Sequence, residues 1–187
     1  MSLSPSKCKI LEFMLLNDKS ADAAEIAKES GTDLKAARMH LLGLNKTGYT
    51  ASPAKGQFVL TPKGKQALGV PETTRECAKE ILTQLSNEKA FHFYAAVDNP
   101  LNLQANGLQE FINRLQAVDV ASLEFHLNRG DFEKWFAALG DIELSVKAVL
   151  LKKKVVAGEE LRETLRSILE KRCATLNKIA ESVDPLL

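Results

Sequence analysis

The chain has 187 residues, of which 45% are hydrophobic and 26% charged, and its formal net charge at pH 7 is +1. This composition is ordinary for a soluble chain with enough apolar residues for one large or two small domain cores. No apolar run approaches the ~20 residues that span a bilayer, and no signal-peptide pattern begins the chain, so we expect neither a membrane span nor a secretory leader.

The charge is unevenly divided along the chain. Residues 1–70 hold ten Lys or Arg against six Asp or Glu, whereas residues 71–187 hold fifteen against eighteen. A modest positive excess in the first part suits a module that contacts phosphates. Cys8, Cys77 and Cys173 are far apart and lack C-x-x-C spacing, which predicts reduced thiols in a cytoplasmic protein.

The first predicted helix begins at Ser4-Pro5 and ends at Asn17-Asp18, with a wide apolar face. A second helix is expected to start at Asp22, because Asp22 and Glu25 form a D-x-x-E pattern in which Glu25 can reach back to a free backbone N–H. Gly31 ends that helix in a tight turn. The apolar faces of these two helices are Ile10, Leu11, Met14 and Leu15, and then Ala23, Ile26 and Ala27.

A third helix is predicted from Asp33 to about Thr47, and Gly48 closes it. Its buried face would hold Leu34, Ala37, Leu41 and Leu44. Two short β-like runs then follow, at 49–52 and 58–60, and the turn residues 53–57 between them predict a hairpin. Thr61 is placed to cap a last short helix that Pro62 begins and Gly69 ends.

The run NKTGYTASPAKGQFVLTPKGKQALG, residues 45–69, resembles the end of the recognition helix, the wing and the closing helix of winged helix-turn-helix DNA-binding domains. The resemblance covers about the first seventy residues and implies double-stranded DNA as a partner. Outward-facing residues on the third helix would meet the DNA, and lysines near the wing would contact its backbone. The candidate contact residues are Lys35, Arg38, Met39, His40, Lys46, Lys55, Lys63 and Lys65. The alternatives are a merely solvated face and a winged helix that binds another protein.

A domain junction is expected at 69–72, which divides the chain into domains 1–70 and 71–187. A helix over 72–87 would connect the halves. The hairpin predicted at 90–105 turns at Asp98-Asn99-Pro100, and its residues Phe91 and Phe93 alternate with polar neighbours.

Several helices are then expected as far as residue 183. The last one, over about 158–182, carries a nearly heptad stripe of Leu161, Leu165, Ile168, Cys173, Leu176, Ile179 and Val183. This stripe predicts a homodimer with Leu165, Leu176 and Ile179 in its seam. The alternative is that the stripe packs onto its own domain.

Residues from about Phe91 to Arg172 resemble a small domain of unknown function found in archaea and bacteria. The resemblance strengthens the domain boundary and implies no activity. It rests on Ser122, Phe125, His126, Arg129, Asp131, Phe132, Trp135, Gly140 and Asp141.

A polar cluster of His126, Arg129 and Asp131 falls within six residues, with His92 as a further candidate. Such a set could form a polar pocket or an acid–base pair. The alternative is structural: Asp131 caps the following helix, and Arg129 pairs with Glu124 or Asp131. No metal-ligand spacing or nucleotide-binding loop is present, so we expect no metal, no cofactor and no enzyme.

The sequence therefore predicts a mainly α (α+β) fold: a winged helix-turn-helix followed by a helical domain with a small β-hairpin and a long last helix. The expected function is that of a cytoplasmic DNA-binding transcriptional regulator whose second half dimerises or senses an effector. The competing prediction is a non-enzymatic protein-interaction module that binds another protein through the winged helix.

Overall fold

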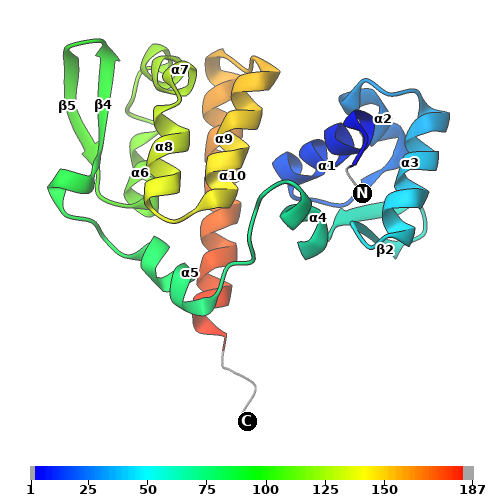
Figure 1. Ribbon diagram of the computed structural model, residues 1–187. Helices are drawn as coiled ribbons and strands as arrows, with labels where there is room; N and C mark the ends of the chain where they lie inside the picture. Colours follow the sequence, from blue (N-terminus) through cyan, green and yellow to red (C-terminus); the bar gives the residue numbers. More distant parts are fainter. Residues whose placement is uncertain (1–2, 183–187) are drawn as a thin grey trace. The chain divides into compact units, whose positions relative to one another are not determined.

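The computed structural model describes residues 3–182, which are mainly helical with two small antiparallel sheets. The chain divides into two compact units, Met1–Glu72 and Thr73–Leu187. Figure 1 shows the helices and strands of both units. Of the helices within the described range, none combines the length and apolarity needed to cross a membrane.

As far as it is described, the first unit consists of three helices, a short strand between the first two, a hairpin and a short closing helix. Its elements are α1 (Pro5–Asn17), β1 (Ala21–Asp22), α2 (Ala23–Ser30), α3 (Leu34–Lys46), β2 (Thr50–Ala54), β3 (Gln57–Leu60) and α4 (Pro62–Ala67). The strands form an antiparallel sheet in the order β1-β3-β2. The two-residue strand β1 was not predicted, because only its pairing of Ala21 with Phe58 in β3 makes it a strand.

The predicted N-caps Asp22 and Thr61 are confirmed, and Asp33, predicted only as a helix start, also caps its helix. Asp22 accepts hydrogen bonds from two backbone N–H groups of α2, and Asp33 does the same for α3. The Thr61 hydroxyl accepts from the Gly64 N–H at 3.1 Å. The prediction that Glu25 reaches back to a backbone N–H at the helix start is wrong, since its carboxylate pairs with Lys19 at 2.7 Å. These caps fix where the helices begin.

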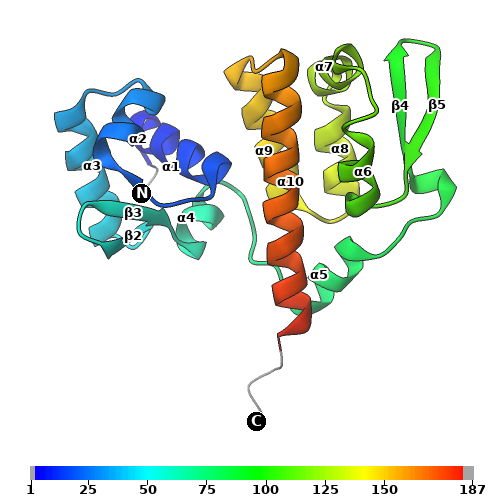
Figure 2. The same cartoon turned by 180° about the vertical axis from the view of Figure 1, so that it is seen from behind.

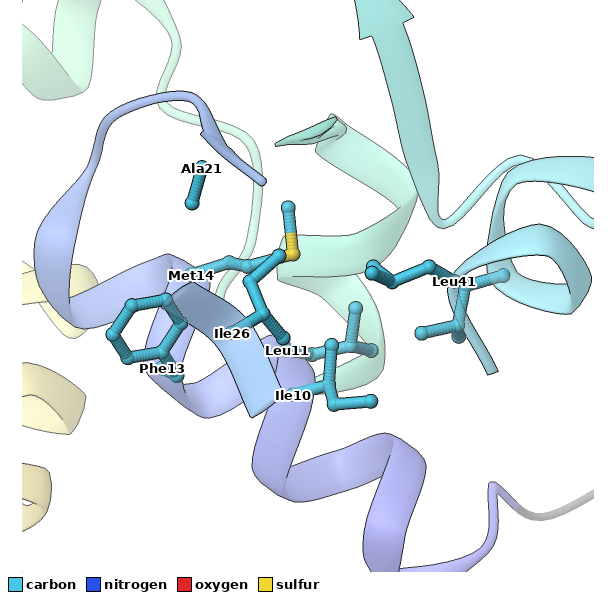
Figure 3. Close-up of a cluster of buried hydrophobic side chains, with 8 residues drawn as sticks. Ile10, Leu11, Phe13, Met14, Ala21, Ile26 and Leu41 are labelled. Atoms are coloured by element: carbon cyan, nitrogen blue, oxygen red, sulfur yellow. The ribbon is translucent and has the colours of Figure 1, made fainter. Parts of the chain in front are cut away.

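The core of the first unit lies among α1, α2 and α3 (Figure 3). The predicted apolar faces supply it, and Ile10, Leu11 and Ile26 are fully buried. Leu41 and Leu44 of α3 are buried in the same cluster. Leu34 is the exception, because it lies in the first turn of α3 and remains 39% exposed.

The hairpin of the first unit is longer than predicted. Pro53 belongs to strand β2 and not to the turn, which is reduced to Lys55-Gly56. A proline fits there because β2 is an edge strand and needs no N–H on its outer side. Helix α4 approaches the sheet closely, since a Cβ at Gly64 would lie 2.3 Å from the Tyr49 carbonyl oxygen.

The second unit combines one hairpin with six α-helices in the described residues (Figure 2). Helix α10 is the longest and contacts α5, α6, α7 and α9, while α7 also contacts β4. The elements are α5 (Arg75–Leu82), the 3-10 turn η1 (Asn87–Lys89), β4 (Phe91–Ala96), β5 (Asn99–Ala105), α6 (Leu108–Arg114), α7 (Val120–Arg129), α8 (Asp131–Ala138), α9 (Ile142–Lys154) and α10 (Gly158–Glu181).

Two predicted boundaries in the second unit are wrong. The helix expected over 72–87 is only α5, because Thr74 caps its start and the chain is already extended at Thr83. The turn of the β4–β5 hairpin is Val97-Asp98, with Asp98 in the left-handed region at φ 59°. Asn99-Pro100 belongs to β5 instead.

An aromatic cluster that includes Phe91, Phe111, Phe132 and Trp135 forms the core of the second unit. Phe91 lies within 5.5 Å, centroid to centroid, of the rings of Phe111, Phe132 and Trp135. The Trp135 indole N–H donates to the Lys89 carbonyl at 3.1 Å, so its polar atom is also satisfied. Edge-to-face contacts of this kind favour a rigid core.

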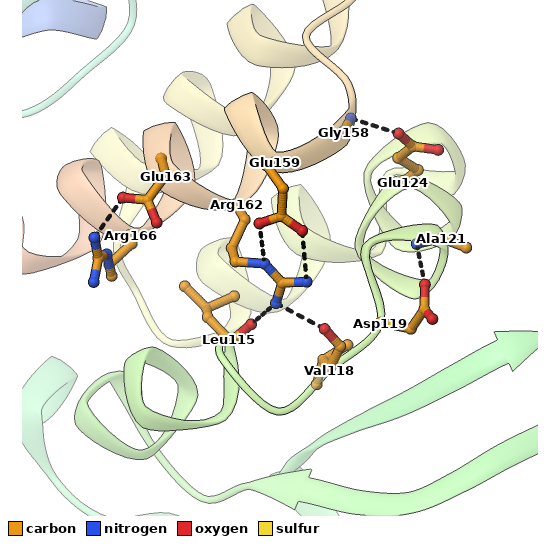
Figure 4. A network of polar contacts seen from close by, with 10 residues as sticks. All are labelled: Leu115, Val118, Asp119, Ala121, Glu124, Gly158, Glu159, Arg162, Glu163 and Arg166. Carbon is orange, nitrogen blue, oxygen red and sulfur yellow. Dashed lines mark hydrogen bonds and ion pairs between the residues drawn. The ribbon is translucent and has the colours of Figure 1, made fainter.

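The apolar stripe of α10 packs onto its own unit. Leu165 and Leu176 are at most 1% exposed within the single chain, so the predicted dimer seam is wrong for these two residues. Val183 lies outside the described residues. The N-terminal part of α10 is also fastened by polar contacts: Arg162 donates to the carbonyls of Leu115 and Val118, and Glu124 accepts from the Gly158 N–H (Figure 4).

Candidate functional site

Helix α3 presents an exposed stripe of four residues. Lys35 and Lys46 stand at its ends, and Met39 and Leu42, 64% and 65% exposed, lie between them. Positions separated by four, three and four residues share one side of a helix. The opposite side is buried in the core of the first unit. The exposed side of α3 therefore carries both positive charge and apolar area.

The wing turn lies beside α3. Arg38 and Leu42 line a hollow of about 450 Å³ together with Gly56 of the turn and Phe58 of β3. Arg38 and Lys55 are exposed, whereas His40 is half-buried. Of the predicted contact residues of α3, the fold thus brings Arg38 close to the turn that carries Lys55.

The two lysines of α4 take part in the fold. The Lys63 ammonium donates to the Thr47 carbonyl at 2.9 Å and lies 5.0 Å from the centroid of the Tyr49 ring. This contact ties α4 to the end of α3. Lys65 is half-buried. Of the predicted contact residues, these two have the least freedom to meet a partner.

Charge of one sign is concentrated in α3, the wing and α4. Residues 34–71 contain six Lys or Arg and no Asp or Glu, and all six acidic residues of the first seventy precede position 34. The prediction from overall charge missed this separation, although it is legible in the sequence. A run of cations without acidic neighbours raises the local electrostatic potential more than the count of the whole unit suggests.

The chain matches no protein-family model, no curated protein and no solved structure. The resemblances to winged-helix domains and to the domain of unknown function therefore stay predictions.

His126 is the centre of the polar cluster in the second unit. It is 3% exposed, its Nε2 lies 2.9 Å from the Tyr94 backbone nitrogen, and its Nδ1 lies 2.8 Å from Asp131 Oδ2. A backbone N–H can only donate, so Nε2 accepts and the ring proton is on Nδ1, where it donates to Asp131. Burial lowers the pKa of His126, against the opposing effect of the Asp131 carboxylate.

Asp131 does not cap α8, and the prediction that it does is wrong. The N-cap is Gly130, in the left-handed region at φ 76°, and Asp131 is the first helical residue. Its Oδ2 atom turns toward His126 and also lies 3.4 Å from Arg129 Nε. Of the two partners expected for Arg129, Asp131 is confirmed.

Ser122 and His126 together hold the backbone of Tyr94. The Ser122 hydroxyl donates to the Tyr94 carbonyl at 2.7 Å, and His126 accepts from the Tyr94 N–H. The strand ladder is irregular at this residue, which lies opposite Pro100. The pair therefore docks the hairpin on α7, and both His126 nitrogens are occupied. His92 is exposed, and its Nε2 lies 3.2 Å from the Asn87 carbonyl oxygen.

Four charged residues at the α9–α10 contact were missed as a group. Asp141 caps α9 at Leu144, is fully buried, and accepts from Arg172 Nε at 2.8 Å. Arg172 also bonds Glu143, which pairs with the buried Lys147 at 2.8 Å. The i,i+4 spacing of Glu143 and Lys147 was the available signal, and it is more typical of exposed helix pairs.

Proposed function

We propose that this chain is a cytoplasmic DNA-binding transcriptional regulator that contacts double-stranded DNA through α3 and the β2–β3 wing. The observation that carries the proposal is the run of six cations without an acidic residue over positions 34–71. Phosphate neutralisation supplies a large share of the affinity of such modules, so this excess of cations favours DNA as the partner. Asp22 lines the same hollow as Arg38 and lowers the local positive charge there.

The stripe on α3 suits a major groove. Helix α3 has 13 residues, about 20 Å of helix, and one exposed side with Lys35 and Lys46 at its ends. Terminal cations can reach phosphates on the groove walls, and apolar side chains such as Met39 and Leu42 can contact thymine methyl groups. Lys55 at the wing turn would add a contact to the backbone. The second unit would then sense an effector.

A second candidate is a protein partner. Three of the six large hydrophobic side chains exposed in the described residues belong to α3: Leu34, Met39 and Leu42. An amphipathic helix with exposed apolar residues can fill a groove of another protein. Leu165 and Leu176 do not form a dimer seam, because both side chains are buried within their own unit.

Binding of a random-sequence duplex pool by the full chain tests the proposal. Replacing Lys35 and Arg38 together with Ala should weaken binding roughly tenfold or more. The matched control is Lys9→Ala with Lys28→Ala, which removes the same charge from exposed positions on α1 and α2. Equal weakening in both double variants would indicate a nonspecific charge effect, and undiminished binding by Lys35→Ala with Arg38→Ala would reject α3 as the DNA-contacting helix.

A further inference from the structure

A hollow of about 410 Å³ lies between the β4–β5 hairpin and the C-terminal turn of α7. Tyr94, Val97 and Phe125 contribute apolar surface to it, and the charged side chains of Asp98, Arg129 and Asp131 line it as well. Its size is within the range of pockets that hold small molecules, and such pockets combine apolar walls with a few fixed polar groups.

The Arg129 side chain is held in place by a series of contacts. The Tyr94 N–H fixes His126, His126 fixes Asp131, and Asp131 Oδ2 lies 3.4 Å from Arg129 Nε. The guanidinium also lies over the Phe125 ring, 5.0 Å from its centroid. Binding sites gain affinity when neighbouring residues fix the side chains that contact the ligand.

Only one of the three guanidinium nitrogens of Arg129 faces an acceptor within residues 3–182. Its Nε faces Asp131, while Nη1 and Nη2 form no hydrogen bond with the described residues. The side chain is 51% exposed. A guanidinium fixed on one side and open on the other presents parallel N–H groups that match the two oxygens of a carboxylate.

We propose that this hollow binds a small monocarboxylate with an apolar body. The carboxylate would pair with the open side of Arg129, and the body would lie against Tyr94, Val97 and Phe125. A doubly charged phosphate fits less well, because Asp98 and Asp131 also line the hollow and repel a dianion about twice as strongly as a monoanion. This proposal does not depend on whether the first unit binds DNA.

Amide NMR spectra of the full chain, titrated with phenylacetate and with hexanoate, test the proposal. Both should shift the Tyr94 and Phe125 amide resonances saturably, whereas the neutral amides phenylacetamide and hexanamide should bind at least about tenfold more weakly. Arg129→Ala should weaken phenylacetate binding by a similar factor, and Arg129→Lys should lie between. Lys134→Ala, at an exposed position of α8, is the control and should bind as the parent does.

Three results would overturn the proposal. One is the absence of saturable shifts with either carboxylate up to about 20 mM, which is weaker than useful small-molecule affinity. Another is equal affinity for each carboxylate and for its neutral amide. The third is parental affinity in Arg129→Lys and in Arg129→Ala, with the parental spectrum retained away from the hollow.

Discussion

The two units use their charged residues differently. In the first unit Lys35, Arg38 and Lys55 form no ion pair with the described residues, and Asp22 and Asp33 cap helices. In the described part of the second unit four charged side chains are buried and paired with each other: Asp141, Glu143, Lys147 and Arg172.

This difference assigns different roles to similar residues. A buried charge must be paired because the interior cannot solvate it, so its contribution is to the fold of the second unit. An exposed cation without a partner contributes little to stability and remains available to an anionic ligand. Overall composition does not separate the two cases, since both units contain ordinary numbers of charged residues.

The largest expected effect on the free energy of unfolding comes from a substitution in the buried charged group of the second unit. Arg172→Ala leaves Asp141 and Glu143 buried without their common partner, so we expect a loss of about 3–5 kcal/mol in the free energy of unfolding. Arg166→Ala removes an arginine of the same helix that pairs with the exposed Glu163, and should cost at most about 1 kcal/mol. Urea unfolding of both variants measures the difference. Equal losses would mean that burial does not distinguish the two arginines.

A smaller effect is expected from protonation of His126. Its folded-state pKa is lowered by burial, so the unfolded chain binds the proton more readily, and this residue's contribution to stability falls as the pH drops below about 6.5. Linkage of one proton limits the change to about 1.4 kcal/mol per pH unit. Urea unfolding at about pH 7.5 and about pH 5.5 should show a weaker pH dependence in His126→Gln than in the parent.

Asp131→Asn sharpens the same test. The Asp131 carboxylate raises the pKa of His126 against the effect of burial, so its removal should lower that pKa further and steepen the loss of stability at low pH. A flatter dependence in this variant would contradict the assigned hydrogen bond between Nδ1 and Asp131.

The smallest effect on stability is expected in the first unit. Lys35→Ala and Arg38→Ala should each change the free energy of unfolding by less than about 0.5 kcal/mol, because both side chains are exposed. Thermal unfolding of the double variant checks this. A loss as large as that of Arg172→Ala would place these residues in the fold and not at a partner surface.

The parts of the fold that local chemistry determines could be predicted from the sequence. Asp22, Asp33 and Thr61 each act within three residues of their own position, and so the starts of α2, α3 and α4 were predictable. The strand β1 was not, because it depends on a partner 37 residues away at Phe58. The mainly helical α+β class follows from periodicity over long segments, which does not depend on such distant pairs.

In the candidate sites, too, local patterns were predictable and contacts between distant residues were not. The exposed face of α3 followed from helical spacing, but Leu42 was not predicted to lie on it, because a leucine in an amphipathic helix is more typical of the buried face. Asp131 follows a glycine and precedes an apolar helix, which is the pattern of a cap, yet its carboxylate binds His126, five residues earlier in α7. Arg172 meets Asp141 across 31 residues, and no local pattern predicts that pairing.

The dependence of DNA affinity on salt tests the central claim most directly. If α3 neutralises phosphates, a plot of log affinity against log salt for the parent should be steep, and Lys35→Ala with Arg38→Ala should reduce its slope by nearly two units, about 0.9 for each lost contact. The Lys9→Ala, Lys28→Ala control should keep the parental slope. A parental slope near zero, or the same slope in all three proteins, would contradict the claim that the unpaired cations of α3 are there to bind DNA.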